Sequence, residues 1–109
     1  MSKSSFNVNL SPREVFHLVM NEQNADLIHD EFQELGDGRS MGTLVFEKYY
    51  MRTSNRAALV VLIDNVQGVT NVRVISTGSS EGVFFKFDWG ASANFVDSVE
   101  NILARYIIS

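Results

Sequence analysis

The chain of 109 residues contains no cysteine. This absence excludes disulfide bonds, thiolate metal sites and cysteine nucleophiles together. Proline is scarce too, since Pro12 is the only one, and there are just two histidines, His17 and His29. Thiolate chemistry is therefore excluded, and chemistry that depends on histidine has few residues to use.

Long apolar runs and clusters of basic residues are also missing. The N-terminal segment lacks the apolar core of a signal peptide, and no apolar run approaches the length of a membrane-spanning helix. The nine lysines and arginines are scattered along a chain of net charge −4, whereas nucleic-acid binding needs a clustered basic surface. We therefore expect a cytoplasmic protein that binds neither membranes nor nucleic acids.

The composition that remains is that of a folded domain. Apolar residues make up 45% of the chain and charged residues 20%, which is typical of globular proteins and not of disordered ones. The length suffices for one domain with one modest core, so we expect a single domain over residues 1–109.

The clearest local signal is the start of a helix at Ser11-Pro12-Arg13-Glu14, a capping box with proline at the first helical position. Residues 6–10 alternate between apolar and polar, which predicts a short strand before this helix. After a polar break at residues 21–24, helical spacing resumes up to Leu35. The pattern predicts a broken N-terminal helix, either one bent helix or two.

From residue 43 the pattern changes to strands. Segments rich in β-branched and aromatic residues, separated by short turns, predict four strands at residues 43–51, 57–63, 69–77 and 83–87. Helical spacing then returns over residues 95–108, with Asp88 or Ser92 as the candidate N-cap. The predicted fold class is α+β in the order β-α-β-β-β-β-α, a curved antiparallel sheet with both helices on one face.

This order, with residues 11–16 opening the first helix, resembles the helix-grip and TATA-binding-protein-like architectures. In those folds a curved antiparallel sheet grips a long C-terminal helix, which would be residues 95–108 here. Residues 78–80 and the segment 84–91, with its Phe-Asp-Trp-Gly-Ala run, resemble a small bacterial family of uncharacterised proteins, a domain of unknown function. The resemblance implies the fold and a cytoplasmic location, and it implies no activity.

Residues 78–82 match the Gly-x-Ser-x-Gly pattern of serine hydrolases. That chemistry needs Ser80 on a strand-to-helix turn with its acid and histidine partners later in the chain. Both histidines come earlier here, and a strand is expected next, so a hairpin turn is the better interpretation. A weaker alternative is anion binding by the backbone amides of Gly78, Ser79 and Ser80.

Metal and acid–base sites lack support in the sequence. Nothing places His17 and His29 on one face at the spacing of metal ligands. Asp64, Asp88 and Glu100 form no carboxylate pair whose proximity the sequence establishes. We therefore expect no metal, no cofactor and no enzymatic activity.

Residues 57–63 are apolar at every position, so this strand carries apolar side chains on both faces. Helices can cover one face of a single sheet. The second set, on the other face, comprises Ala58, Val60 and Leu62, with Tyr49 and Met51 of the neighbouring strand. We expect a second copy in a homodimer, or a partner protein, to cover this set. The simpler alternative is coverage by a loop or a terminus.

Trp89, the only tryptophan, lies at the predicted junction of strand and last helix. It is interpreted either as a lid on the core or as a residue at the mouth of a pocket between sheet and helix. Such a pocket would be lined by Phe85, Phe87, Trp89, Phe95 and Val99 and would hold a small apolar ligand. The leading hypothesis is a non-catalytic module that associates through its sheet, and the ligand pocket is the alternative.

Overall fold

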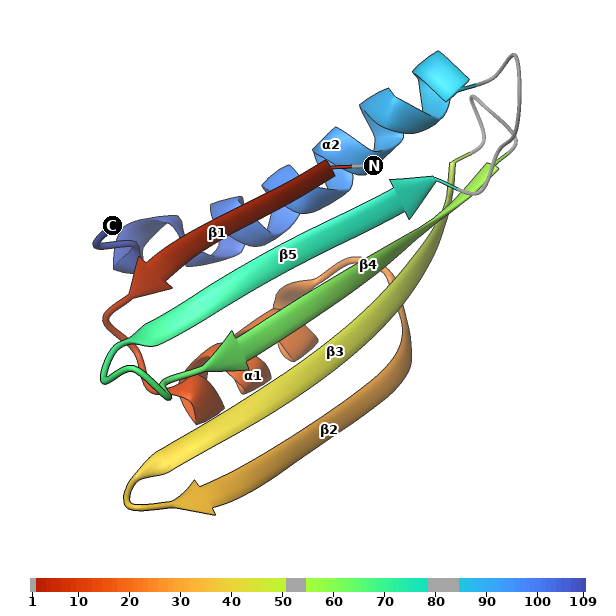
Figure 1. The fold of residues 1–109 in the computed structure, drawn as a ribbon. Coiled ribbons are helices and arrows are strands. Elements are labelled where there is room, and N and C mark those ends of the chain that lie inside the picture. The colour runs from red at the N-terminus through yellow and green to blue at the C-terminus, as the bar shows by residue number, and fades with distance from the viewer. Residues whose placement is uncertain (1, 51–54, 79–84) are drawn as a thin grey trace.

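The computed structural model describes residues 2–50, 55–78 and 85–109 (Figure 1). It confirms the α+β class and the order β-α-β-β-β-β-α. The elements are β1 (Ser2–Val8), α1 (Pro12–Glu22), β2 (Asp26–Gly36), β3 (Arg39–Tyr50), β4 (Asn55–Asp64), β5 (Thr70–Gly78), α2 (Phe85–Leu103) and a 3-10 turn, η2 (Ala104–Tyr106). In this part of the chain no helix has both the length and the apolarity needed to cross a membrane.

The five strands form one antiparallel sheet in the order β1-β5-β4-β3-β2. Both helices lie on the same side of it, where α1 packs against β3 and β4, and α2 packs against β5, β4 and β1 (Figure 1). The last residues of the chain return to β1, because the N–H of Asn9 donates to the Tyr106 carbonyl and the N–H of Ile108 to the Asn7 carbonyl. Because both helices lie on the same side, the sheet has one helix-covered side and one side that we call the open face.

The predicted start of the first helix is confirmed. The Ser11 hydroxyl accepts a hydrogen bond from the Glu14 N–H at 3.1 Å, and the Glu14 carboxylate accepts one from the Ser11 N–H at 2.9 Å. The box satisfies two backbone donors that the first turn of a helix leaves without partners. Helix α1 then buries one apolar stripe, Val15, Phe16 and Val19, against the sheet.

The predicted second half of the first helix is wrong, because residues 26–36 form strand β2. β2 pairs with β3 along its whole length, and a two-residue loop of Asp37 and Gly38 joins them. Both loop residues have positive φ (55° and 76°), the backbone of the tight hairpin turns that twist with their strands. The spacing of Leu27, Ile28 and Leu35 fits a helix, yet pairing with β3 supplies the backbone hydrogen bonds here.

The predicted fourth strand of the run, residues 83–87, is also wrong where it is described. Residues 85–87 belong to α2, which begins at Phe85, and residues 83 and 84 lie outside the described part. Asp88 and Ser92 are therefore inside the helix and do not cap it. The last helix ends at Leu103, earlier than predicted, and the fifth strand of the sheet is β2 instead.

The core lies between the sheet and the two helices. Its members are fully or almost fully buried side chains from both helices and from four of the strands: Phe6, Val8, Val15, Phe16, Val19, Leu44, Phe46, Ala57, Leu59, Val61, Ile63, Val72, Val74, Phe95, Val96, Val99 and Leu103. Strand β2 contributes no buried side chain and only one that is half-buried, Phe32. The apolar side chains of the other four strands thus determine which side of the sheet the helices cover.

Candidate functional site

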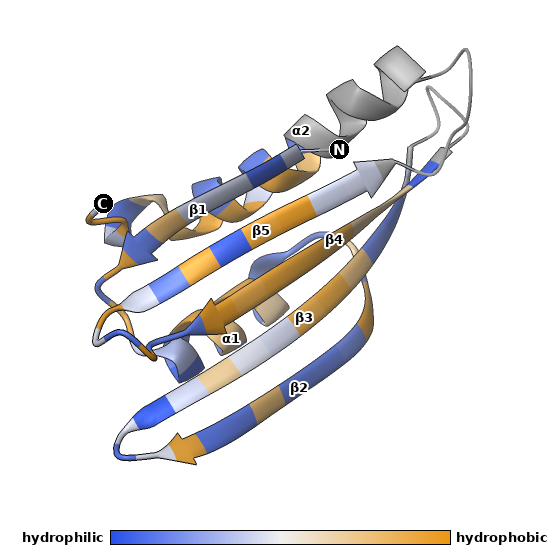
Figure 2. Cartoon of the chain, in the orientation of Figure 1, coloured by the Kyte–Doolittle hydropathy of each residue, from blue (hydrophilic) through white to orange (hydrophobic). Residues whose placement is uncertain are grey.

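The open face carries a group of partly exposed aliphatic side chains at its middle. Strand β4 supplies Ala58, Val60 and Leu62, which alternate with the buried residues of the same strand. Val45 of β3 and Ile75 of β5 lie on either side of Val60 in the pairing register. Because directly paired residues share a face, these five side chains form one patch, which we call the apolar centre. Figure 2 shows the underlying pattern, with apolar residues along β4 and mostly polar residues along β2.

The face is organised in cross-strand rows, each with one residue from every strand. From β1 to β2, the row through the centre is Lys3, Ile75, Val60, Val45 and His29. The next row is Ser5, Arg73, Leu62, Thr43 and Glu31, and the one after it is Asn7, Asn71, Asp64, Met41 and Gln33. The charge and polarity of the side chains therefore change along each row, from one edge of the sheet to the other.

Charges of opposite sign lie on opposite sides of the apolar centre. Lys3 of β1 and Arg73 of β5 form what we call the basic edge, and both are exposed. Asp26 and Glu31 of β2 form the acidic edge, and both are exposed as well. The Glu31 carboxylate lies 3.5 Å from Nε2 of His29. The open face thus combines an apolar middle with a positive and a negative flank.

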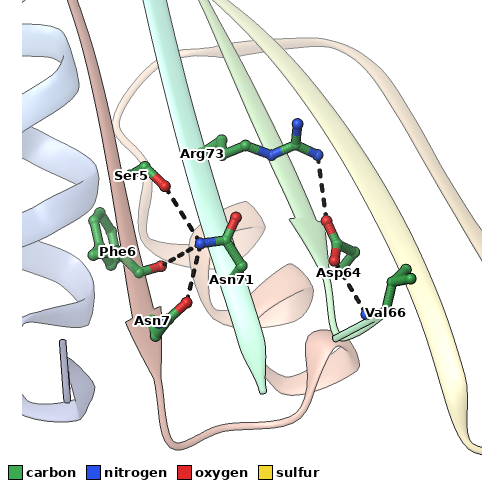
Figure 3. Close-up of polar contacts among 7 residues, drawn as sticks. All are labelled: Ser5, Phe6, Asn7, Asp64, Val66, Asn71 and Arg73. Atoms are coloured by element: carbon green, nitrogen blue, oxygen red, sulfur yellow. Dashed lines mark hydrogen bonds and ion pairs between the residues drawn. The ribbon is translucent and has the colours of Figure 1, made fainter. Parts of the chain in front are cut away.

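The end of the face near the β4–β5 turn is polar (Figure 3). The side-chain amide of Asn71 donates to the Ser5 hydroxyl, the Phe6 carbonyl and the Asn7 side-chain oxygen at 3.0–3.3 Å. The guanidinium of Arg73 donates to the Asp64 carboxylate at 3.3 Å. These contacts fasten the edge strand β1 to β5 and fix the direction of Arg73.

A hollow of about 570 Å³ lies at this polar end. Its wall includes Asn7, Met41, Asp64, Asn71 and Arg73 from four strands, together with residues of the β4–β5 turn. Two smaller hollows lie beside the basic and acidic edges, lined by Arg73 with Ile75 and by Glu31 with Thr43. The open face is therefore contoured and not flat.

The predicted interface residues fall largely on this face. Ala58, Val60 and Leu62 point to the open side, whereas Ala57, Leu59, Val61 and Ile63 are buried beneath the helices. Tyr49 shares the open face through its pairing with Arg56, and half of its surface is exposed. Met51 lies outside the described residues. Whether a partner binds here stays a prediction.

The predicted ligand pocket is less well described. Phe95 and Val99 of α2 are fully buried members of the core. Phe85, Phe87 and Trp89 belong to the same helix by their backbone, and their side chains lie outside the described part. Ser76, on the helix side of β5, is buried, and its hydroxyl has no hydrogen-bond partner among the described residues. The pocket itself stays a prediction.

The remaining candidate site residues from the sequence are not brought together in the described part of the chain. Gly78 is the last residue of β5, and Ser79 and Ser80 of the proposed anion site lie outside the described residues. His17 is on α1, on the helix side, and His29 is on the open face, so the sheet separates them. Within residues 2–50, 55–78 and 85–109, no group of three or more histidine and acidic side chains is arranged to hold a metal ion.

Sequence reasoning missed the charged flanks and part of the apolar centre. Ile75 and Arg73 occupy alternate positions of a strand that was predicted, so their shared face was readable from the strand period. Lys3 lay before the predicted first strand, and Glu31 lay in a predicted helix. No local signal assigned Lys3 and Glu31 to one sheet face, because that requires knowing that β1 pairs with β5 and β2 with β3.

The fold and this face describe an α+β protein with a single-layer sheet open on one side. The chain belongs to the DUF6054 family, a family of unknown function, whose model matches residues 1–107. The comparisons with curated proteins and with solved structures gave no significant match. The family supports the expectation of an uncharacterised module and names no activity. The cytoplasmic location and the bacterial origin stay predictions.

Proposed function

We propose that this protein is a small non-catalytic module that self-associates through the open face of its sheet. The observation that carries the proposal is the apolar centre. Five aliphatic side chains from three neighbouring strands lie together on a side that neither helix covers. Contiguous apolar surface with a polar rim is characteristic of protein–protein contacts, since isolated monomers rarely expose it.

The size of the face supports a weak association. The five strands together are about 24 Å wide, and the face extends about 20 Å along them from the row of Asn7 to the row of Ala58, so each copy would bury roughly 500 Å². A total of roughly 1,000 Å² is near the lower limit for specific interfaces. We therefore expect dimers that form in the micromolar concentration range and separate on dilution.

The architecture supports a further proposal about the fold. A long last helix lying on one side of an antiparallel sheet, with the first helix beside it, is the arrangement of helix-grip and TATA-binding-protein-like proteins. The support is the order of the elements and the position of α2 against β1, β4 and β5. Such a fold leaves the second sheet face available for contacts with other molecules.

The oligomeric state tests the proposed function directly. Light scattering after size exclusion, with sedimentation equilibrium across the micromolar range, should show a concentration-dependent dimer of the wild-type chain. Val60→Lys places a charge in the middle of the apolar centre, where it must be desolvated on association, and should yield a monomer. A wild-type chain that stays monomeric up to millimolar concentration would refute the proposal.

Asn101→Lys is the matched control. Asn101 is an exposed residue of α2 on the helix side of the sheet, so this variant adds the same charge outside the open face. This variant should dimerise like the wild type. Circular dichroism and thermal unfolding of both variants establish that Val60→Lys loses the dimer and not the fold. If both variants dimerise, the open face is not the interface.

A further inference from the structure

The open face has a polarity that restricts how two copies can meet on it. The basic edge (Lys3 and Arg73) lies on β1 and β5, and the acidic edge (Asp26 and Glu31) lies on β2. The apolar centre lies between these edges, with β4 at the middle of the five strands. A surface with this layout is complementary to itself only in particular orientations.

Two simple two-fold arrangements bring one sheet face to face with another. A two-fold axis parallel to the strands places β4 on β4, β5 on the partner's β3, and β1 on the partner's β2. An axis perpendicular to the strands, in the plane between the sheets, places every strand on the same strand of the partner. In both cases the contact is isologous, so each favourable or unfavourable contact occurs twice.

The perpendicular axis brings like charges together. It stacks β1 on β1 and β2 on β2, so Lys3 would face the Lys3 of the other copy, and the acidic edge would face its own duplicate. Like charges across an interface cost several kcal/mol when they lose solvent. This orientation is therefore disfavoured.

We propose that the occupant of the open face is a second copy of this chain, related by a two-fold axis parallel to β4. This inference rests on the proposed function and adds the orientation to it. The basic edge of each copy then lies over the acidic edge of the other. Lys3 is placed above the partner's His29, between the partner's Asp26 and Glu31, and Arg73 is placed above the partner's Thr43, beside the same Glu31.

The apolar centre is also self-complementary about this axis. Val60, Leu62 and Ala58 lie on β4, so each faces its own copy across the axis. Ile75 of β5 faces the partner's Val45 of β3, and Val45 faces the partner's Ile75. The hollow of about 380 Å³ lined by Lys3, Arg73 and Ile75 is positioned to receive that valine. Apolar and charged contacts therefore favour the same orientation.

One acidic residue lies on the axis itself. Asp64 would face the Asp64 of the other copy, at the polar end of the face. Its carboxylate already accepts hydrogen bonds from the Arg73 guanidinium and from the Val66 N–H at 3.1 Å. The hollow at this end leaves room for water between the copies. Water can therefore hydrate the two Asp64 carboxylates, and the Arg73 of each copy neutralises its own Asp64.

Charge reversal at the two edges tests the orientation. Three strands separate Lys3 from Glu31 within one copy, so the two side chains lie about 19 Å apart and cannot pair with each other. Lys3→Glu and Glu31→Lys should each weaken the dimer at least about tenfold, because each puts like charges together twice. The double variant should restore dimerisation to within about threefold of the wild type, since the reversed charges meet across the interface.

A matched double variant separates this effect from net charge. Glu22 is an exposed residue of α1, on the helix side of the sheet. The variant Lys3→Glu/Glu22→Lys has the same net charge as the wild type and as the rescued double variant. It should remain as weak as Lys3→Glu alone. A mixture of the Lys3→Glu and Glu31→Lys chains should form the heterodimer in preference to either homodimer.

The outcomes distinguish the two proposals. A dimer that Val60→Lys abolishes, combined with rescue by the double reversal, supports the strand-parallel axis. A dimer that Val60→Lys abolishes without such rescue overturns this orientation and leaves the proposed function standing. A wild-type chain that is monomeric at all concentrations overturns both.

Discussion

Phe32 of β2 lies directly opposite Gly42 of β3, and its ring covers the space that a side chain at position 42 would occupy. The ring of Phe16 from α1 meets the Phe32 ring edge to face, with centroids 5.2 Å apart. Above them the Arg13 guanidinium lies 4.3 Å from the Phe32 centroid and pairs with Glu34. This cluster is what attaches the otherwise exposed strand β2 to helix α1.

Gly42→Ala should therefore destabilise the protein although it adds a single methyl group. The new Cβ would lie 2.7 Å from Cδ1 of Phe16 and 3.0 Å from Cδ1 of Phe32, so at least one ring must move. We expect a loss of about 1–3 kcal/mol in the free energy of unfolding, measured by urea denaturation. Adding Phe16→Leu should cost less in the Gly42→Ala background than in the wild type. Strictly additive losses would contradict the steric explanation.

Asn71→Ala should loosen the edge strand β1. The Asn71 amide bridges Ser5, Phe6 and Asn7, so the variant removes side-chain hydrogen bonds that join β1 to β5. A loss of about 1–2 kcal/mol in unfolding free energy is expected, with faster amide hydrogen exchange concentrated in β1. Asn24→Ala, at an exposed position between α1 and β2, is the control and should change neither quantity. Unchanged exchange in β1 would show that the strand is held by its backbone alone.

The proposed dimer should weaken as salt concentration rises. The basic edge of one copy attracts the acidic edge of the other near the rim of the interface. There, dissolved salt screens charge–charge interactions beyond about 3 Å at 1 M and beyond about 10 Å at 0.1 M. Sedimentation equilibrium at these two sodium chloride concentrations should show a higher dissociation constant at 1 M. The double variant Lys3→Glu/Glu31→Lys should show the same dependence. A dimer that tightens with salt would instead be held by apolar contacts alone.

Much of this fold can be predicted from local sequence patterns, and the predictions that are wrong have specific physical causes. The capping box at Ser11 and the two-sided apolar strand around Val60 were predicted because their signals are contained in a few consecutive residues. β2 was missed although Asp37-Gly38, a strong hairpin signal, follows it. Its apolar residues imitate helical spacing, and a strand exposed on nearly all sides has no clean alternation to reveal it.

The candidate site was predictable only in part for the same reason. Ala58, Val60 and Leu62 followed from one strand that is apolar throughout. The flanks did not, because Lys3 and Glu31 are brought to one face by pairings between segments far apart in the chain. Neither residue carries a local mark of its role. Their relationship exists only in the assembled sheet.

The position of β1 has a consequence for how the protein is made. Ser5 and Asn71, which meet across β1 and β5, are 66 positions apart in the chain. During synthesis β2, β3 and β4 can pair as they emerge, while β1 must wait for β5 before it has a neighbour. The first of these five strands to be synthesised is therefore among the last to be incorporated into the sheet, and this long-range closure is the step expected to limit the rate of folding.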